Sequence, residues 1–110
     1  MFGWFGANKK GWQNITPKEV EALIQAKRDI QIIDVRELAE YNEGHIKQAK
    51  WIPLGQLRTR HQEINNKETI VVCYSGGRSR KACDILASLG HTNLKNMVGG
   101  MMNWEGKITR

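Results

Sequence analysis

The chain has 110 residues and a formal net charge of +6, from 17 Lys and Arg against 11 Asp and Glu. This length accommodates one domain with one modest core, and 40% apolar with 25% charged residues is the composition of an ordinary globular domain. The basic residues are scattered rather than gathered in a run, and no RNA-binding aromatic motif accompanies them. The charge therefore favours solubility and an anion-friendly site over nucleic-acid binding.

Residues 1–12 are rich in glycine and aromatic side chains, and we expect them to form a tail before a domain that spans residues 13–110. Phe2, Trp4 and Phe5 precede Lys9 and Lys10, which is the reverse of a secretory signal, and the run is far too short to span a bilayer. We expect one or two of the aromatic side chains to pack on the domain, in preference to a shallow contact with a membrane.

The first helix is predicted to begin at Thr16. Thr16 can cap it, Pro17 suits its first turn, and Glu19 can reach back to close a capping box. Apolar residues then follow on one face at Val20, Leu23 and Ile24.

Strands and helices alternate along the next part of the chain. Residues 30–35 read as a buried strand, and a short helix follows through Tyr41 and ends at Gly44. A brief strand over residues 51–53 is stopped by its proline, and residues 54–64 form a short helix.

The stretch that starts at residue 70 organises the chain. Residues 70–72 are apolar and β-branched, as in a buried strand, and Cys73 then leads into a Gly-Gly loop. A helix follows, with a last strand over residues 94–98; the apolar residues of the helix are Ala82, Ile85, Leu86 and Leu89. The alternation predicts an α/β domain whose central sheet is mainly parallel. Ligands in such sheets lie outside the carboxyl ends of strands, where Cys73 is expected.

The surroundings predicted for Cys73 are those of a reactive thiol. Backbone N–H groups of the loop and of the helix N-terminus favour an anion there, and Arg78 and Arg80 add positive charge that lowers the pKa of the thiol. Gly76 and Gly77 let the backbone fold around the sulfur without a Cβ clash. We expect this thiol to be exposed and therefore easily oxidised, which leaves redox sensing as a side role. The alternative is an inert cysteine buried at the end of a strand.

Three motifs, in the right order, resemble the single-domain rhodaneses, which are thiosulfate or persulfide sulfurtransferases. The loop from Cys73 to Ser79 (CYSGGRS) resembles their active-site loop. Residues 34–53, with DVRE, Tyr41 and GHI, resemble a second signature in the first half of the chain, and residues 98–104 (VGGMMNW) resemble the C-terminal ending of the family, a final helix with a core tryptophan. The resemblance implies a rhodanese-like domain of three layers, with a mainly parallel central sheet of about five strands flanked by helices.

The resemblance further implies a mechanism and a set of site residues. Cys73 is the catalytic nucleophile, which takes a sulfane sulfur from thiosulfate or a persulfide donor as a persulfide and passes it to a thiol or cyanide acceptor. The substrate-binding residues are those of the loop, Tyr74, Ser75, Gly76, Gly77 and Arg78, whose amides cradle the sulfur. The family gives His45 a structural role. This mechanism requires no metal and no other cofactor, and the acceptor can be a protein that takes up the persulfide.

Two other functions are compared with this one. A phosphatase or arsenate reductase places five residues between its cysteine and arginine, whereas only four separate Cys73 from Arg78, and Val72 stands where tyrosine phosphatases commonly have histidine. We therefore disfavour phosphatase activity. A dedicated persulfide carrier for one protein partner, or a non-catalytic rhodanese-like binding or regulatory module, would keep the same fold.

Cys83 is the second cysteine, and we expect it to be a small core residue of the helix rather than a resolving thiol. A bridge to Cys73 would distort the chain, because Cys83 lies well into the helix. Two cysteines without a secretory signal favour a reducing compartment, and we predict a cytoplasmic location.

Overall fold

The computed structural model describes residues 11–110. Their central sheet has five strands in the order β1-β5-β4-β2-β3, and every pairing is parallel. The strands are β1 (Trp12–Ile15), β2 (Ile30–Asp34), β3 (Ala49–Trp51), β4 (Glu68–Val72) and β5 (Leu94–Met97). The predicted α/β architecture with a parallel sheet of about five strands is confirmed.

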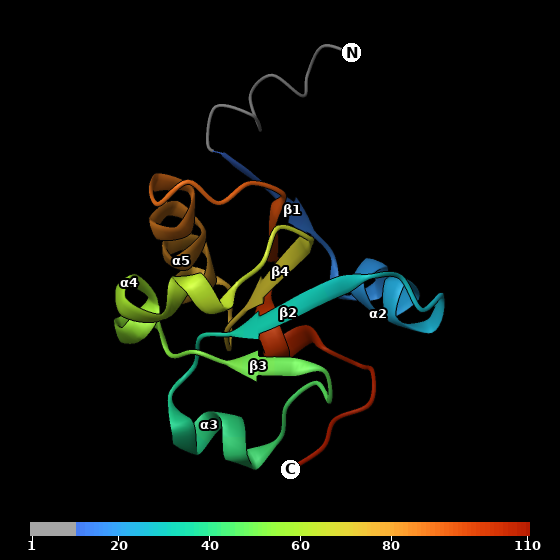
Figure 1. Cartoon of the computed structure of the whole chain (residues 1–110). Helices are drawn as coiled ribbons and strands as arrows, with labels where there is room; N and C mark the ends of the chain where they lie inside the picture. Colours follow the sequence, from blue (N-terminus) through green and yellow to red (C-terminus); the bar gives the residue numbers. More distant parts are fainter. Residues whose placement is uncertain (1–10) are drawn as a thin grey trace.

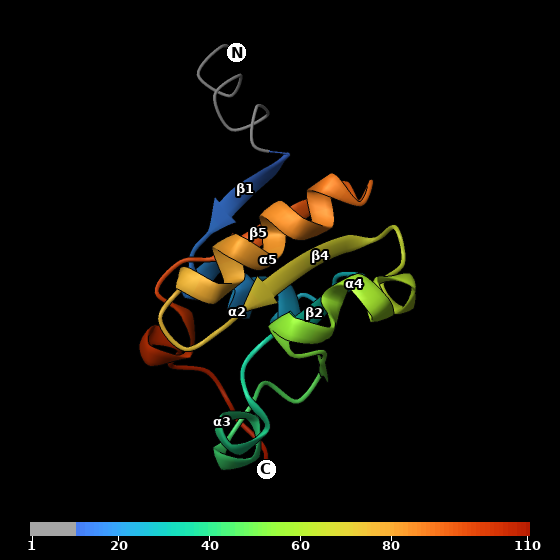
Figure 2. The ribbon, with the colours of Figure 1, turned by 90° about the vertical axis from the view of Figure 1, so that its left-hand side faces the viewer.

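Helices cover both faces of the sheet and produce three layers (Figures 1 and 2). On one face lie α4 (Leu57–Arg60) and α5 (Gly77–Ser88), and on the other lies α2 (Pro17–Gln25). The short helix α3 (Leu38–Glu43) lies beyond the edge strand β3, near the C-terminus (Figure 1). Three 3₁₀ turns complete the described elements: η1 (Leu54–Gln56), η2 (His61–Glu63) and η3 (Gly100–Asn103).

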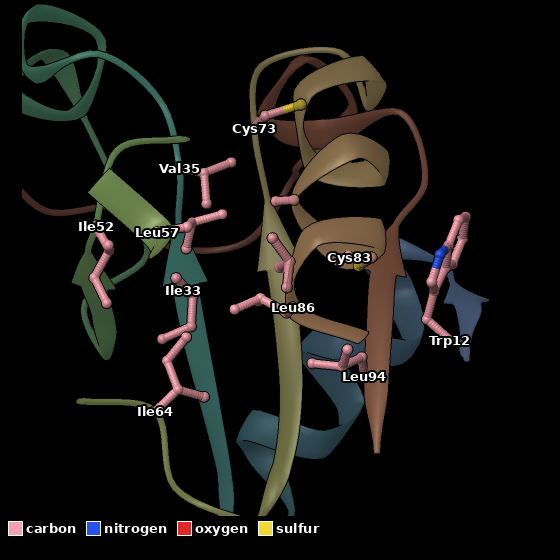
Figure 3. Close-up of a cluster of buried hydrophobic side chains, with 12 residues drawn as sticks. Trp12, Ile33, Val35, Ile52, Leu57, Ile64, Cys73, Cys83, Leu86 and Leu94 are labelled. Atoms are coloured by element: carbon pink, nitrogen blue, oxygen red, sulfur yellow. The ribbon is translucent and has the colours of Figure 1, made fainter. Parts of the chain in front are cut away.

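The sheet separates two apolar clusters, because successive side chains of a strand point to opposite faces. Ile33 and Val71 pack with Leu86 and other residues of α4 and α5 in one cluster (Figure 3). Ile32 and Ile70 belong to the second cluster, beneath α2. Strands that are buried on both faces explain the nearly continuous apolar runs of the sequence.

The predicted start of α2 is confirmed in detail. The Glu19 amide donates to Thr16 Oγ1 at 3.1 Å, and the Thr16 amide donates to Glu19 Oε1 at 2.9 Å. This is a capping box, with Pro17 in the first turn.

Strand β1 was missed in the sequence. Trp12, which we assigned to the end of the tail, is the first residue of β1; it is buried, and its Nε1 donates to Asp84 Oδ1 at 2.8 Å. The strand is short and has the polar residues Gln13 and Asn14 at its centre, so it lacks the apolar run by which β2 and β4 were found. Residues 1–10 of the predicted tail lie outside the described residues.

Three further elements differ from the prediction in extent. The brief strand expected at residues 51–53 is β3, which ends at Trp51, and the helix expected over residues 54–64 is divided into η1, α4 and η2. Only Leu57 and Ile64 of that segment are buried, too few contacts to hold one regular helix. The final helix is the 3₁₀ turn η3, followed by a half-buried Trp104 that packs against the second cluster. Within residues 11–110, no helix is both long enough and apolar enough to cross a membrane.

Candidate active site

Cys73 lies directly after β4, where the chain turns toward α5. Its side chain points toward the first turn of that helix (Figure 3). Gly76 caps the helix with a φ of 108°, a left-handed conformation that favours glycine. The structure thus places the predicted cysteine at the carboxyl end of a central strand and at the beginning of a helix.

The sulfur of Cys73 is hydrogen-bonded to the loop that follows it and to the first turn of α5. The Gly76 amide donates to Sγ at 3.0 Å, and the hydroxyl of Ser79 lies 3.4 Å from the same atom. Burial alone raises the pKa of this thiol, but hydrogen bonds from the Ser79 side chain and from the amides of Ser79, Gly76 and Ser75 outweigh it and hold the pKa below its ordinary value. The site therefore stabilises the thiolate relative to a thiol in water.

The expectation that this thiol is exposed was wrong, because Cys73 is fully buried. The turn η3 packs on the loop: the Met101 amide donates to the Cys73 carbonyl at 2.8 Å, and the Met102 amide donates to the Tyr74 carbonyl at 2.9 Å. Gly100 makes this contact possible, since a Cβ at that position would lie 2.5 Å from the Cys73 carbonyl oxygen. Of the predicted substrate-binding residues, Tyr74, Ser75 and Gly77 are exposed at the rim, while Gly76 is buried under the sulfur.

Arg78 is occupied by an acidic partner that we did not predict. Its guanidinium donates two hydrogen bonds to the Glu40 carboxylate in α3, at 2.7 and 2.8 Å. The Arg78 hydrogen bonds lower the pKa of Glu40 to about 2, and the same bonds raise the pKa of Arg78. The positive charge that we expected to act on the thiol is thus largely neutralised, and the side chain of Arg80 is exposed. Hydrogen bonds are the main cause that lowers the pKa of Cys73, and the charge of Arg78 also interacts favourably with this thiolate.

A groove of about 470 Å³ runs beside the loop. Apolar and acidic residues dominate its lining, which includes Tyr74, Met101, Ile108, Glu40 and Glu43. Arg36 also lines the groove, but its guanidinium is bound to the Asp34 carboxylate and to the Gly44 carbonyl.

His45 contacts backbone and an aromatic ring rather than the sulfur. Its Nδ1 lies 2.9 Å from the Tyr41 carbonyl oxygen, and its ring stacks on the Tyr41 ring with 3.7 Å between centroids. These contacts fit the structural role that the resemblance implied. Among residues 11–110, no three His, Cys, Asp or Glu side chains gather where they could hold a metal ion.

Cys83 faces the core from the middle of α5 (Figure 3). It is fully buried in the first apolar cluster, and burial raises the pKa of its thiol to about 12. The prediction of a small core residue is confirmed.

The sequence and the fold have known relatives. A family model described as "Rhodanese-like domain" matches residues 16–107. The chain belongs to the rhodanese-like domain family. The resemblance carried by the three sequence motifs is thereby confirmed, and a crystal structure of a rhodanese-like domain protein from Staphylococcus aureus superimposes with a TM-score of 0.80 at 31% identity, over 86% of this chain and 93% of that one.

Several curated relatives carry names that refer to sulfur chemistry. "Putative sulfur carrier protein YrkF" of Bacillus subtilis is 38% identical over 101 residues, which are 91% of this chain and 55% of that protein. A "Sulfurtransferase" of Allochromatium vinosum is 32% identical over 77 residues, 69% of this chain and 72% of that protein. The chain spans only about half of YrkF, so the activity of that whole protein is not transferred to this rhodanese-like domain.

Proposed function

We propose that this rhodanese-like domain is a sulfurtransferase that carries sulfane sulfur as a persulfide on Cys73. The Cys73 thiolate attacks the outer sulfur of thiosulfate or of a persulfide donor, and a new S–S bond forms at Sγ. The old S–S bond breaks, and its electron pair leaves with sulfite or with the donor thiolate. An acceptor thiolate or cyanide then attacks the outer sulfur and releases the Cys73 thiolate, so that the cycle needs no external oxidant.

The observation that carries this proposal is the polar cradle around a buried sulfur. A nucleophile for this chemistry must be deprotonated near neutral pH, and the Gly76 amide at 3.0 Å from Sγ, with the Ser79 hydroxyl, favours that state. The same donors would stabilise the Cys73 thiolate that is released when an acceptor removes the outer sulfur. The exposed Tyr74 and Ser75 form the rim over which a donor enters, and Arg78 lies beside it.

A dedicated persulfide carrier for one protein partner is the second candidate. It is favoured by the pairing of Arg78 with Glu40, which leaves little free positive charge to attract a small dianion such as thiosulfate. The name of YrkF as a sulfur carrier points in the same direction. In either case we place the reaction in the reducing cytoplasm, where thiols persist.

Intact mass spectrometry tests the proposal. Reduced protein is incubated with thiosulfate, or with a small-molecule persulfide, and its mass is measured before and after addition of cyanide. We expect a gain of one sulfur atom that cyanide reverses. Cys73→Ser should abolish the gain and leave the far-UV circular dichroism unchanged, whereas Cys83→Ser, the matched control, should retain it.

The outcomes separate the candidates. Loading by thiosulfate supports a general sulfurtransferase, and loading by the persulfide alone supports a dedicated carrier. A gain that persists in Cys73→Ser, or no gain from either donor, overturns the mechanism.

A further inference from the structure

A chain of polar side chains leads from the Cys73 sulfur across the sheet. Ser79 and Asn96 are both buried, with exposures of 0% and 2%. The Ser79 hydroxyl lies 3.4 Å from Cys73 Sγ and also forms a short hydrogen bond with Asn96 Oδ1. Asn96 Nδ2 in turn donates to Asn14 Oδ1 at 3.1 Å, and Asn14 is exposed on the edge strand β1. A buried asparagine in β5 therefore connects the active-site serine with a surface residue.

Ser79 cannot satisfy all its neighbours at once. Its hydroxyl has one hydrogen, and three acceptors surround it: Cys73 Sγ, Asn96 Oδ1 and the Gly76 carbonyl, which lies 3.1 Å away. When the hydrogen points at Asn96, the sulfur receives no hydrogen bond from Ser79. A protonated Cys73 suits this arrangement, because its S–H can donate to Ser79 Oγ.

A thiolate demands the reverse arrangement. The Ser79 hydroxyl must then donate to the sulfur, and an Asn96 oxygen in close contact with Ser79 Oγ would leave two oxygens facing each other without a hydrogen. A half turn of the Asn96 amide removes this conflict, because it presents the NH₂ group to Ser79 in place of the oxygen. Asn14 can follow the turn, since its exposed amide can donate to Asn96 Oδ1 as readily as it accepts from Nδ2.

We propose that Asn96 is a positioning residue that acts on the Cys73 sulfur through Ser79, and that its amide turns as the sulfur changes between thiol and anion. Asn14 sets the direction of that amide from the surface. The proposal rests on Cys73 as the reacting sulfur. It predicts that an acceptor-only side chain at position 96 or at position 14 holds the Ser79 hydrogen away from the sulfur.

Replacement of Asn96 or Asn14 by aspartate tests this prediction, because aspartate has nearly the same shape as asparagine but no side-chain N–H group. The rate at which iodoacetamide alkylates Cys73 is measured from pH 5 to 10 by mass spectrometry of the Cys73 peptide. We expect Asn96→Asp to lower the rate at pH 7 by about ten-fold, the effect of one hydrogen bond to a charged group. The curve should move to higher pH with an unchanged plateau.

Asn14 provides a second variant, because its exposed position tolerates a charged residue. Asn14→Asp should hold the Asn96 NH₂ group toward the surface and lower the same rate by about three-fold, a smaller effect because water competes at an exposed site. Asn66→Asp adds the same charge in the exposed turn before β4, at the other end of that strand, and should leave the rate unchanged.

A Ser79→Ala background separates hydrogen bonding from charge. Both aspartate variants should lose their effect in that background, because the hydroxyl that they redirect is missing. An equal fall of the rate with and without Ser79, or no change in Asn14→Asp and Asn96→Asp, overturns the role of Asn96. Alkylation needs no sulfur donor, so this result is independent of whether Cys73 forms a persulfide.

Discussion

The two cysteines of this domain are equally buried and chemically opposite. Both have an exposure of 0%, and both belong to the same apolar cluster on the α5 side of the sheet. Hydrogen bonds nevertheless hold the pKa of Cys73 below its ordinary value, while burial raises the pKa of Cys83 to about 12. Burial alone therefore does not determine the reactivity of a thiol in this fold.

The difference comes from what each sulfur faces. Cys73 lies before the first turn of α5, where amides that have no partner within the helix can turn toward it. Cys83 lies in the body of the same helix, where every amide is already bonded to a carbonyl one turn earlier. The charges of Asp84 and Cys73 raise the pKa of Cys83 further. One helix thus offers an anion site at its beginning and an apolar environment along its side (Figure 3).

Displacement of η3 from the active-site loop should disrupt the hydrogen bonds around the Cys73 sulfur. A Cβ on Gly100 would lie 2.5 Å from the Cys73 carbonyl oxygen and from the Tyr74 carbonyl group, and the φ of Gly100 is 61°. Gly100→Ala should lower the free energy of unfolding by about 2–3 kcal/mol and the alkylation rate of Cys73 at pH 7 by at least about five-fold. Urea unfolding and iodoacetamide kinetics measure the two effects.

Gly90→Ala is the matched control. Gly90 also has a left-handed φ, of 96°, but a Cβ there would meet nothing within 4 Å. The substitution should cost about 1 kcal/mol of stability and leave the alkylation rate unchanged. An unaltered rate in Gly100→Ala, with the protein folded, would show that the contact with η3 does not shape the loop.

Local features of the site could be predicted from the sequence. The strand before Cys73, the glycine at the turn and the cap at Thr16 all depend on residues a few positions apart, and the structure confirms each of them. The parallel sheet followed from the alternation of strands and helices.

Contacts between distant residues could not be predicted in this way. Glu40 reaches Arg78 across 38 positions, and Ser79 meets Asn96 across 17. Only the packing of α3 beside the loop and of β5 beside β4 creates these pairs. The sequence around Glu40 and around Asn96 contains no local pattern that predicts them. The full burial of Cys73 was missed for the same reason, since η3 covers the loop from a later part of the chain.

The opposite ionisation of the two thiols should appear in the pH dependence of stability. In the unfolded chain both thiols lose a proton near pH 9, whereas folded Cys83 keeps its proton to about pH 12. The unfolded state then binds fewer protons, so Cys83 makes stability fall by about 1.4 kcal/mol per pH unit above pH 9. Folded Cys73 loses its proton at a lower pH than it does in the unfolded chain. The unfolded state then binds more protons, so Cys73 makes stability rise with pH until about 9.

Paired variants isolate these two slopes. Urea unfolding of Cys83→Ala should show a weaker fall of stability than the unchanged protein between pH 9 and 10.5, and Cys73→Ser should show a weaker rise below pH 9. The rest of the chain contributes equally to each comparison. Parallel stability curves for Cys83→Ala and the unchanged protein above pH 9 would contradict the raised pKa of Cys83.

The smallest expected effect concerns the Glu40–Arg78 ion pair beside Cys73 and the rate at which an anionic reagent reaches this thiol. Glu40→Gln removes the negative charge that neutralises Arg78 and can still accept a hydrogen bond from it. Anionic iodoacetate should then react faster with Cys73 relative to neutral iodoacetamide, and we expect the ratio of the two rates to rise about three-fold at low ionic strength. Glu43→Gln removes a charge from the same groove, and no ion pair joins Glu43 to Arg78. A smaller rise of the rate ratio in Glu43→Gln than in Glu40→Gln would assign the effect to the released Arg78 guanidinium. Equal rises would assign it to the net charge of the groove, and Arg78 would then have no specific part in attracting an anionic donor.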